Sequence, residues 1–256
     1  MAVLRKLLKY DLRANMKIFL FIWPAILVFS VIERLAISAK PDGKLGTILI
    51  STTTTIFVLA VLAACIVSLV VSIVRFYSGL LRDEGYLMFT LPVKPWQLIL
   101  SKFLTALLTV VVTAAISVLA SWYLFDGING FYEVAKLLWN ELDLPSGVTL
   151  VLVGSIIFTS VCMLLLQIYL ACSIGHLFKK HRILWSVLVY YGINILIEVL
   201  SVSGLIGFNA FAVFEYTSTL GMLNTVLGVV LAVQVALCVL YFFVTEHILR
   251  KKLNLE

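Results

Sequence analysis

"TTTTIFVLAVLAACIVSLVVSIV" occupies residues Thr52 to Val74 and contains no charged side chain. A helix that crosses a bilayer needs about 20 consecutive, mostly apolar residues, and this stretch meets that requirement. It lacks the apolar–polar alternation of a barrel strand. In lipid a helix satisfies its own backbone hydrogen bonds, which outweighs the weak strand preference of Val, Ile and Thr. We therefore interpret the stretch as a membrane-spanning helix.

The rest of the chain has the same character. Hydrophobic residues make up 62% of the 256 residues and charged residues only 12%, whereas soluble domains are about 45–50% apolar and about 25% charged. The mean hydropathy is +1.13. The sequence predicts an all-α integral membrane protein in which one membrane domain covers residues 18–256. Its six transmembrane helices are expected at about 18–37, 52–74, 98–124, 148–173, 184–206 and 223–245.

The distribution of Lys and Arg predicts the orientation, because cytoplasmic connections carry an excess of these residues. On one side of the six spans lie Arg5, Lys6, Lys9, Arg13, Lys17, Arg75, Arg82, Lys94, Lys102, Lys179, Lys180, Arg182, Arg250, Lys251 and Lys252. The other side has only Arg34, Lys40, Lys44 and Lys136. We expect a multi-pass protein of the cell membrane with both termini in the cytoplasm. The net charge of +6 follows from this topology and implies no nucleic acid partner.

Residues 1–17 predict an amphipathic helix in the cytoplasmic interface of the membrane. On a helix drawn through them, the apolar side carries Val3, Leu4, Leu7, Leu8, Leu12 and Ala14. The five basic residues of the segment share the other side. A solvated basic leader is the alternative interpretation. Attraction to anionic lipid headgroups is a further expectation.

Motifs for catalysis or cofactor binding are absent from the sequence. Gly43-Lys44 is followed by Leu45 and lacks the upstream glycine of a phosphate-binding loop. The three histidines lie near the predicted cytoplasmic ends of spans, and the four cysteines lie within spans without metal-ligand spacing. We predict no catalytic, cofactor-binding or metal-binding residues in this chain, and no enzymatic activity of its own.

The connection between the second and third predicted spans is unusual. Its segment "LLRDEGYLMFTLPVKPWQL", Leu80 to Leu98, combines charges, aromatic residues and two prolines. Gly85, Pro92 and Pro95 interrupt any continuous helix through it. Apolar and aromatic side chains beside charges are typical of a docking surface. The segment therefore predicts a short cytoplasmic helix that a partner contacts.

The longer stretch "RFYSGLLRDEGYLMFTLPVKPWQLILSKFL", Arg75 to Leu104, resembles the second-to-third connection of ATP-binding-cassette (ABC) transporter permease subunits of the type-2 exporter class. In that family an acidic–Gly–aromatic segment followed by Leu-Pro forms the coupling helix, which sits in a groove of a separate ATPase subunit. The basic N-terminal segment resembles the elbow helix of the family. Six spans, cytoplasmic termini and chain length also match, and the chain resembles, more loosely, permeases that export phenol-soluble-modulin-type peptides.

The resemblance implies a set of ATPase-coupling residues. These are Arg82, Asp83, Glu84, Gly85, Tyr86, Leu87, Phe89, Thr90, Leu91 and Pro92, of which the last two close the segment. It also implies a complex of two permeases and two ABC ATPase subunits, with ATP and Mg bound by the ATPases. The permease would form a homodimer within membrane lipids, and the expected cargo is amphipathic or hydrophobic: a cytolytic or antimicrobial peptide, a lipid or a drug.

The fifth predicted span carries a polar stripe. Ser186, Tyr190, Asn194, Glu198 and Ser201 follow one another at spacings of four, four, four and three, which places them on one helical face. A charge in a span is costly, so Glu198 is expected to face protein or water. The stripe is a candidate substrate pathway. Snorkelling of Glu198 to the outer interface and helix–helix packing by small polar residues are the alternatives.

Two other functions remain open at this point. A secondary carrier would show broken helices and several ionisable groups inside the membrane. A non-transporting scaffold or immunity protein would sequester a ligand without moving it. An ATPase encoded beside this chain would favour the exporter.

Overall fold

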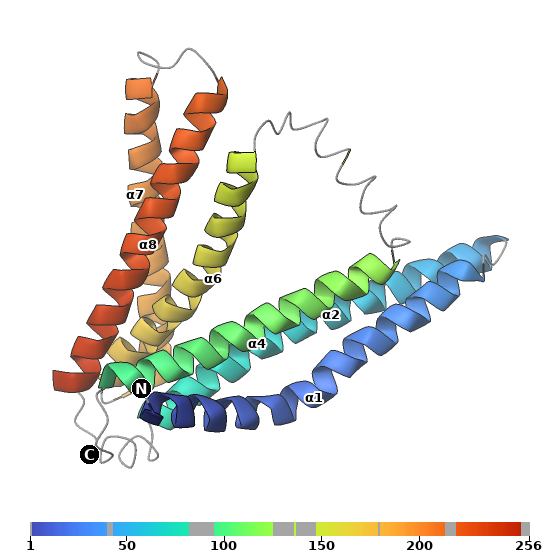
Figure 1. Cartoon of the computed structure of the whole chain (residues 1–256), viewed down its shortest axis with the longest axis horizontal. Helices are drawn as coiled ribbons and strands as arrows, with labels where there is room; N and C mark the ends of the chain where they lie inside the picture. The colour runs from blue at the N-terminus through green and yellow to red at the C-terminus, as the bar shows by residue number, and fades with distance from the viewer. Residues whose placement is uncertain are drawn as a thin grey trace. The chain divides into compact units, whose positions relative to one another are not determined.

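The computed structural model describes residues 2–39, 43–81, 95–124, 136, 147–178, 180–212 and 219–251. The helices in these ranges are α1 (Ala2–Ser38), α2 (Gly43–Leu81), α4 (Pro95–Leu124), α6 (Gly147–His176), α7 (Arg182–Ala212) and α8 (Thr219–Lys251) (Figure 1). The described residues contain no strand. Each of the six predicted spans lies inside one of these helices.

All six helices are long and apolar enough to cross a membrane. Their most apolar stretches have mean hydropathies between 1.9 and 3.1. Large apolar side chains remain exposed along them, for example Phe21 at 78% and Val151 at 72%. Such exposure is unfavourable in water but favourable against lipid tails. For the described residues, the prediction of an all-α fold with six helices able to span a membrane is confirmed.

The chain divides into two compact units. The first comprises Met1–Arg75 and Leu100–Asp143, and it therefore holds α1 with most of α2 and α4. The second comprises Phe76–Ile99 and Leu144–Glu256, and it holds the last residues of α2, the first residues of α4, and α6, α7 and α8. Within the second unit α6 packs against both α7 and α8. A single domain over residues 18–256 stays a prediction.

Helix α1 contains both the predicted interfacial segment and the first span without interruption. All five basic residues between Arg5 and Lys17 are exposed, whereas Leu7, Leu8 and Leu12 are partly buried, as the amphipathic pattern predicts. Pro24 lies within α1, and a proline inside a helix removes a backbone hydrogen bond and favours a kink. Figure 1 shows that α1 bends along its length. The placement of the first 17 residues in the membrane interface stays a prediction.

Candidate functional site

The predicted coupling segment, Arg82 to Pro92, lies outside the described residues, but the helices on both sides of it are described. Helix α2 has 39 residues, which corresponds to about 58 Å at 1.5 Å per residue. That length exceeds the roughly 30 Å of a hydrocarbon core. Leu80 and Leu81 at the end of α2 are buried, and so are Leu98 and Ile99 at the start of α4. The segment is thus flanked by helix ends with buried apolar side chains.

The end of α2 is tied to α6 through aromatic rings. Phe76 stacks on Tyr169 with a centroid distance of 3.9 Å and an interplanar angle of 6°. Both rings are almost completely buried, at 0% and 1% exposure. Tyr77 contacts His176 edge to face at 6.1 Å. We call these four residues the junction. All four belong to the second unit, so the last turns of α2 are packed with α6.

The connection from α6 to α7 is tight. A Cβ atom at Gly175 would lie 2.0 Å from the hydroxyl of Ser186 and 2.6 Å from its backbone nitrogen. The Phe178 ring stacks on Trp185 at 4.2 Å. His181 has a φ of 55°, a left-handed conformation that is uncommon for a residue other than glycine. In its described residues, this connection brings α6 and α7 together at one close approach, that of Gly175 to Ser186.

The polar stripe of the fifth span lies on α7. Ser186, Tyr190 and Asn194 are partly buried, whereas Glu198 and Ser201 are exposed. Asn194 donates a hydrogen bond to the carbonyl of Tyr190, and Ser201 donates to that of Glu198. Both bonds lie within α7 and join the stripe to no other helix. The lining of a substrate route by the stripe stays a prediction.

A second polar stripe, which the interpretation of the sequence missed, runs along α4. Its members follow at every fourth position: Ser101, Thr105, Thr109, Thr113, Ser117 and Ser121. The first five are buried. From Thr105 onward each hydroxyl donates to a carbonyl three or four residues earlier. Because these hydroxyls are hydrogen-bonded to their own helix, they can be buried against another helix at little cost. Their small size lets helices approach closely. The strict spacing of four was readable from the sequence.

The hydroxyl stripe packs α4 against α1 in the first unit. The indole N–H of Trp23 donates to the Thr113 hydroxyl at 3.1 Å. Near one end of the stripe, Lys102 forms an ion pair with Asp11, with 2.5 Å between Nζ and Oδ1. Ser101 donates to the other carboxylate oxygen of Asp11. Removing one partner of this largely buried pair leaves the other charge uncompensated, which is destabilising. The Asp11–Lys102 ion pair therefore helps to hold α1 against α4.

Helix α2 joins the same turn of α1. Arg75 donates a hydrogen bond from Nη2 to the carbonyl of Ala14 at 2.7 Å. Asn15 beside it is 2% exposed. Arg75 and Lys102 stand before and after the predicted coupling segment in sequence. Both helices that lead to this segment are therefore bonded to α1.

At the other end of the first unit, Glu33 of α1 is buried at 2% exposure. Thr54 of α2 donates to its Oε1 at 2.5 Å, and its Oε2 has no partner among the described residues. The neighbouring Arg34 donates to the carbonyl of Leu124 and lies over the Tyr123 ring. Neither Asp11 nor Glu33 was a candidate from sequence, because a single carboxylate on a helix does not reveal which neighbouring helix it faces.

Comparisons with protein families, with curated proteins and with solved structures found no match for this chain. Its function has to be inferred from its own residues. The contacts between the described helices include the junction, the close approach of α6 to α7, and the bonds of α1 to α2 and α4. These contacts hold neighbouring helices together.

Proposed function

We propose that this chain is the membrane-spanning permease subunit of an ABC exporter. The observation that carries the proposal is the segment from Leu80 to Leu98, a charged and aromatic stretch with the acidic–Gly–aromatic and Leu-Pro pattern of a coupling helix. Six long apolar helices and the excess of Lys and Arg on one side support it. A separate ATPase docks on residues 82–92, and the cargo is an amphipathic or hydrophobic molecule such as a membrane-active peptide.

The junction supports a mechanism for this function. Movement of the coupling segment by the docked ATPase would displace the last turns of α2. Phe76 in these turns stacks on Tyr169 of α6. Helix α6 in turn packs on α7 and α8. Closure of two ATPases around ATP favours one arrangement of the spans, and hydrolysis favours another. The stacked rings are one described contact through which this difference passes from the end of α2 to α6.

The proposal is tested by isolating the tagged chain from its native membranes. We expect an ATPase with Walker motifs to co-purify, and its hydrolysis of ATP to rise with amphipathic peptides, lipids or drugs. Isolation of the chain alone, together with vesicle transport that continues without ATP, would reject the exporter.

A secondary carrier is the second candidate, and one observation favours it. Glu33 is buried with one carboxylate oxygen unpartnered among the described residues, and carriers place ionisable groups inside the membrane. Vesicles loaded with ATP but lacking an ion gradient separate the two functions. Transport under those conditions supports the exporter, whereas transport that requires the gradient and is lost in Glu33→Gln supports the carrier.

We expect the Phe76→Leu, Tyr169→Leu double variant to bind the ATPase normally but to transport severalfold less cargo for each ATP hydrolysed. Leucine keeps the site apolar but removes the stacked rings, which contribute about 0.5–1.5 kcal/mol beyond their buried area. Parallel measurement of ATP hydrolysis and vesicle transport checks the result. Phe158→Leu is the matched control, because this ring lies on α6 but is exposed. Unchanged coupling in the double variant would exclude the junction from the mechanism.

A further inference from the structure

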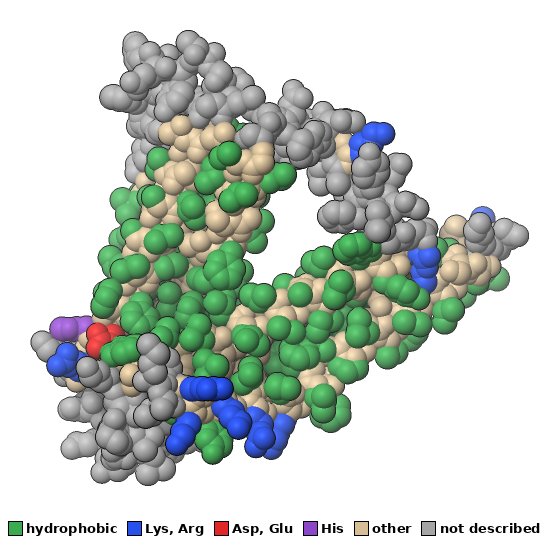
Figure 2. All heavy atoms as spheres, viewed as in Figure 1, with side chains coloured by type: hydrophobic (Ala, Val, Ile, Leu, Met, Phe, Trp, Pro, Cys, Tyr) green, Lys and Arg blue, Asp and Glu red, His purple; other side chains and the backbone are tan. Residues whose placement is uncertain are grey.

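Three cations follow one another along the exposed side of α1. Lys9, Arg13 and Lys17 are spaced by four residues, and none of them has an ion pair or hydrogen bond to the part of the chain that the structure describes. Figure 2 shows Lys and Arg side chains gathered over the first part of α1, beside a mainly hydrophobic surface. Like charges four apart on a helix repel each other. An anion placed between them removes this repulsion.

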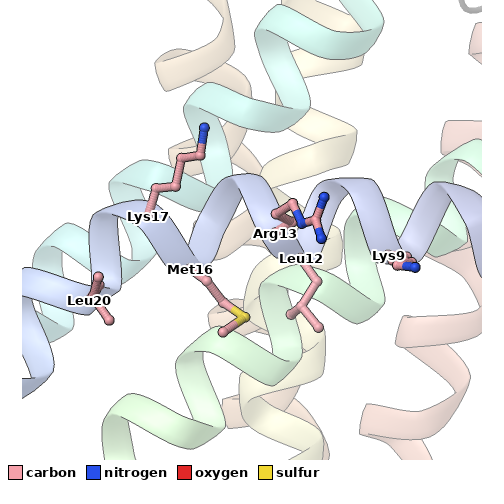
Figure 3. Close-up of a pocket in the computed structure, with 6 residues that line it drawn as sticks. All are labelled: Lys9, Leu12, Arg13, Met16, Lys17 and Leu20. Carbon is pink, nitrogen blue, oxygen red and sulfur yellow. The ribbon is translucent and has the colours of Figure 1, made fainter.

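An apolar ridge runs beside the cations. Leu12, Met16 and Leu20 line the same open groove, of about 390 Å³, as Lys9, Arg13 and Lys17. Figure 3 shows that all six residues come from α1, and that Leu12 and Met16 point away from the side on which Lys17 lies. The groove thus offers positive charge along one edge and an apolar surface along the other.

The groove lies on the side of α1 that the first unit leaves uncovered. Asn15 and Phe19, on the adjoining face of α1, are buried at 2% and 0% exposure. Beyond Lys17 the exposed side becomes apolar, since Leu20 is 65% and Phe21 is 78% exposed. A change from basic to apolar side chains within one turn is typical of a helix at the boundary between headgroups and acyl chains.

We propose that this groove binds an anionic phospholipid. Lys9, Arg13 and Lys17 hold the phosphate of the headgroup, and an acyl chain lies along Leu12, Met16 and Leu20. Successive cations stand about 6 Å apart along the helix axis, so an extended headgroup reaches more than one of them. The apolar ridge selects a lipid over free phosphate, because inorganic phosphate leaves that ridge without a partner.

The test uses the full chain in mixed micelles of phosphatidylglycerol and phosphatidylcholine, with retained lipid measured by native mass spectrometry. Each basic residue near an anionic surface contributes about fivefold in affinity. We therefore expect the Lys9→Gln, Arg13→Gln, Lys17→Gln variant to bind phosphatidylglycerol roughly a hundredfold more weakly. The control, Lys44→Gln, Lys180→Gln, Arg250→Gln, removes the same charge from exposed positions outside the groove and should retain nearly all binding.

Two further measurements keep the result interpretable if the triple variant folds poorly. The charge-retaining variant Lys9→Arg, Arg13→Lys, Lys17→Arg should bind phosphatidylglycerol like the unchanged chain, and added salt should weaken binding to the unchanged chain. Equal loss in the control and groove variants would show a general charge effect and overturn the site. Displacement of the lipid by inorganic phosphate at matched concentration would assign the cations to free phosphate instead. Full binding by the groove variant also overturns the proposal.

Discussion

Replacing Tyr86 and Phe89 together by alanine should release the ATPase from the membrane chain or uncouple ATP hydrolysis from transport. The two residues are three apart, so on a helix they share one face and can enter one groove of the partner. Truncating a buried aromatic anchor at an interface costs at least about 2 kcal/mol, which corresponds to roughly thirtyfold in affinity. Co-purification of the ATPase and ATP-driven vesicle transport measure the two effects.

Two controls define this result. Glu84→Gln removes a charge at the rim of the same segment and should change affinity much less, because exposed ion pairs contribute about 0–1 kcal/mol. Phe158→Ala with Phe243→Ala removes two exposed aromatic rings elsewhere and should leave ATPase binding intact. If the Tyr86, Phe89 variant kept full binding and full transport, the segment from Leu80 to Leu91 would be a simple connection between spans.

The positions of the spans were predictable because hydropathy is a local property of the sequence. The apolar run from Thr52 to Val74 is enough by itself to predict a span. Helix α2 nevertheless extends from Gly43 to Leu81, well beyond that run. A hydropathy window reports the apolar part of a helix and gives no information on polar turns that continue it.

The contacts between helices were not predictable, because they join residues far apart in sequence. Phe76 and Tyr169 stack although 93 positions separate them, and Glu33 meets Thr54 on another helix. The hydroxyl stripe on α4 is an intermediate case. Its spacing of four was visible in the sequence, but the packing of Trp23 against Thr113 required the structure.

The polar stripe of α7 also has a contact with another helix that its sequence pattern could not predict. Periodicity places Ser186, Tyr190 and Asn194 on one side of α7, and all three are partly buried. It does not reveal that Ser186 stands against Gly175 of α6. A polar residue selected as a pathway candidate is thus also a packing residue, and a change at Ser186 tests both roles at once.

We expect Gly175→Ala to lower the thermal stability of the chain strongly. The added methyl group would lie 2.6 Å from the backbone nitrogen and 2.7 Å from the Cα of Ser186, so α6 and α7 have to separate. Overpacking of this kind costs about 1–3 kcal/mol, and the upper end applies because backbone atoms cannot rotate away. Unfolding followed by tryptophan fluorescence in detergent should show the midpoint falling by roughly 5–10 °C.

Gly154→Ala on the same helix is the matched control, since a Cβ there meets no atom within 4 Å. Alanine is the better helix former by about 1 kcal/mol, so this variant should be neutral or slightly more stable. Ser186→Ala added to Gly175→Ala should restore little stability, because it removes only the hydroxyl and leaves the backbone overlap. Full restoration by Ser186→Ala would mean that the side chain alone sets the approach. A Gly175→Ala variant as stable as Gly154→Ala would show that the α6–α7 connection accommodates the methyl group without cost.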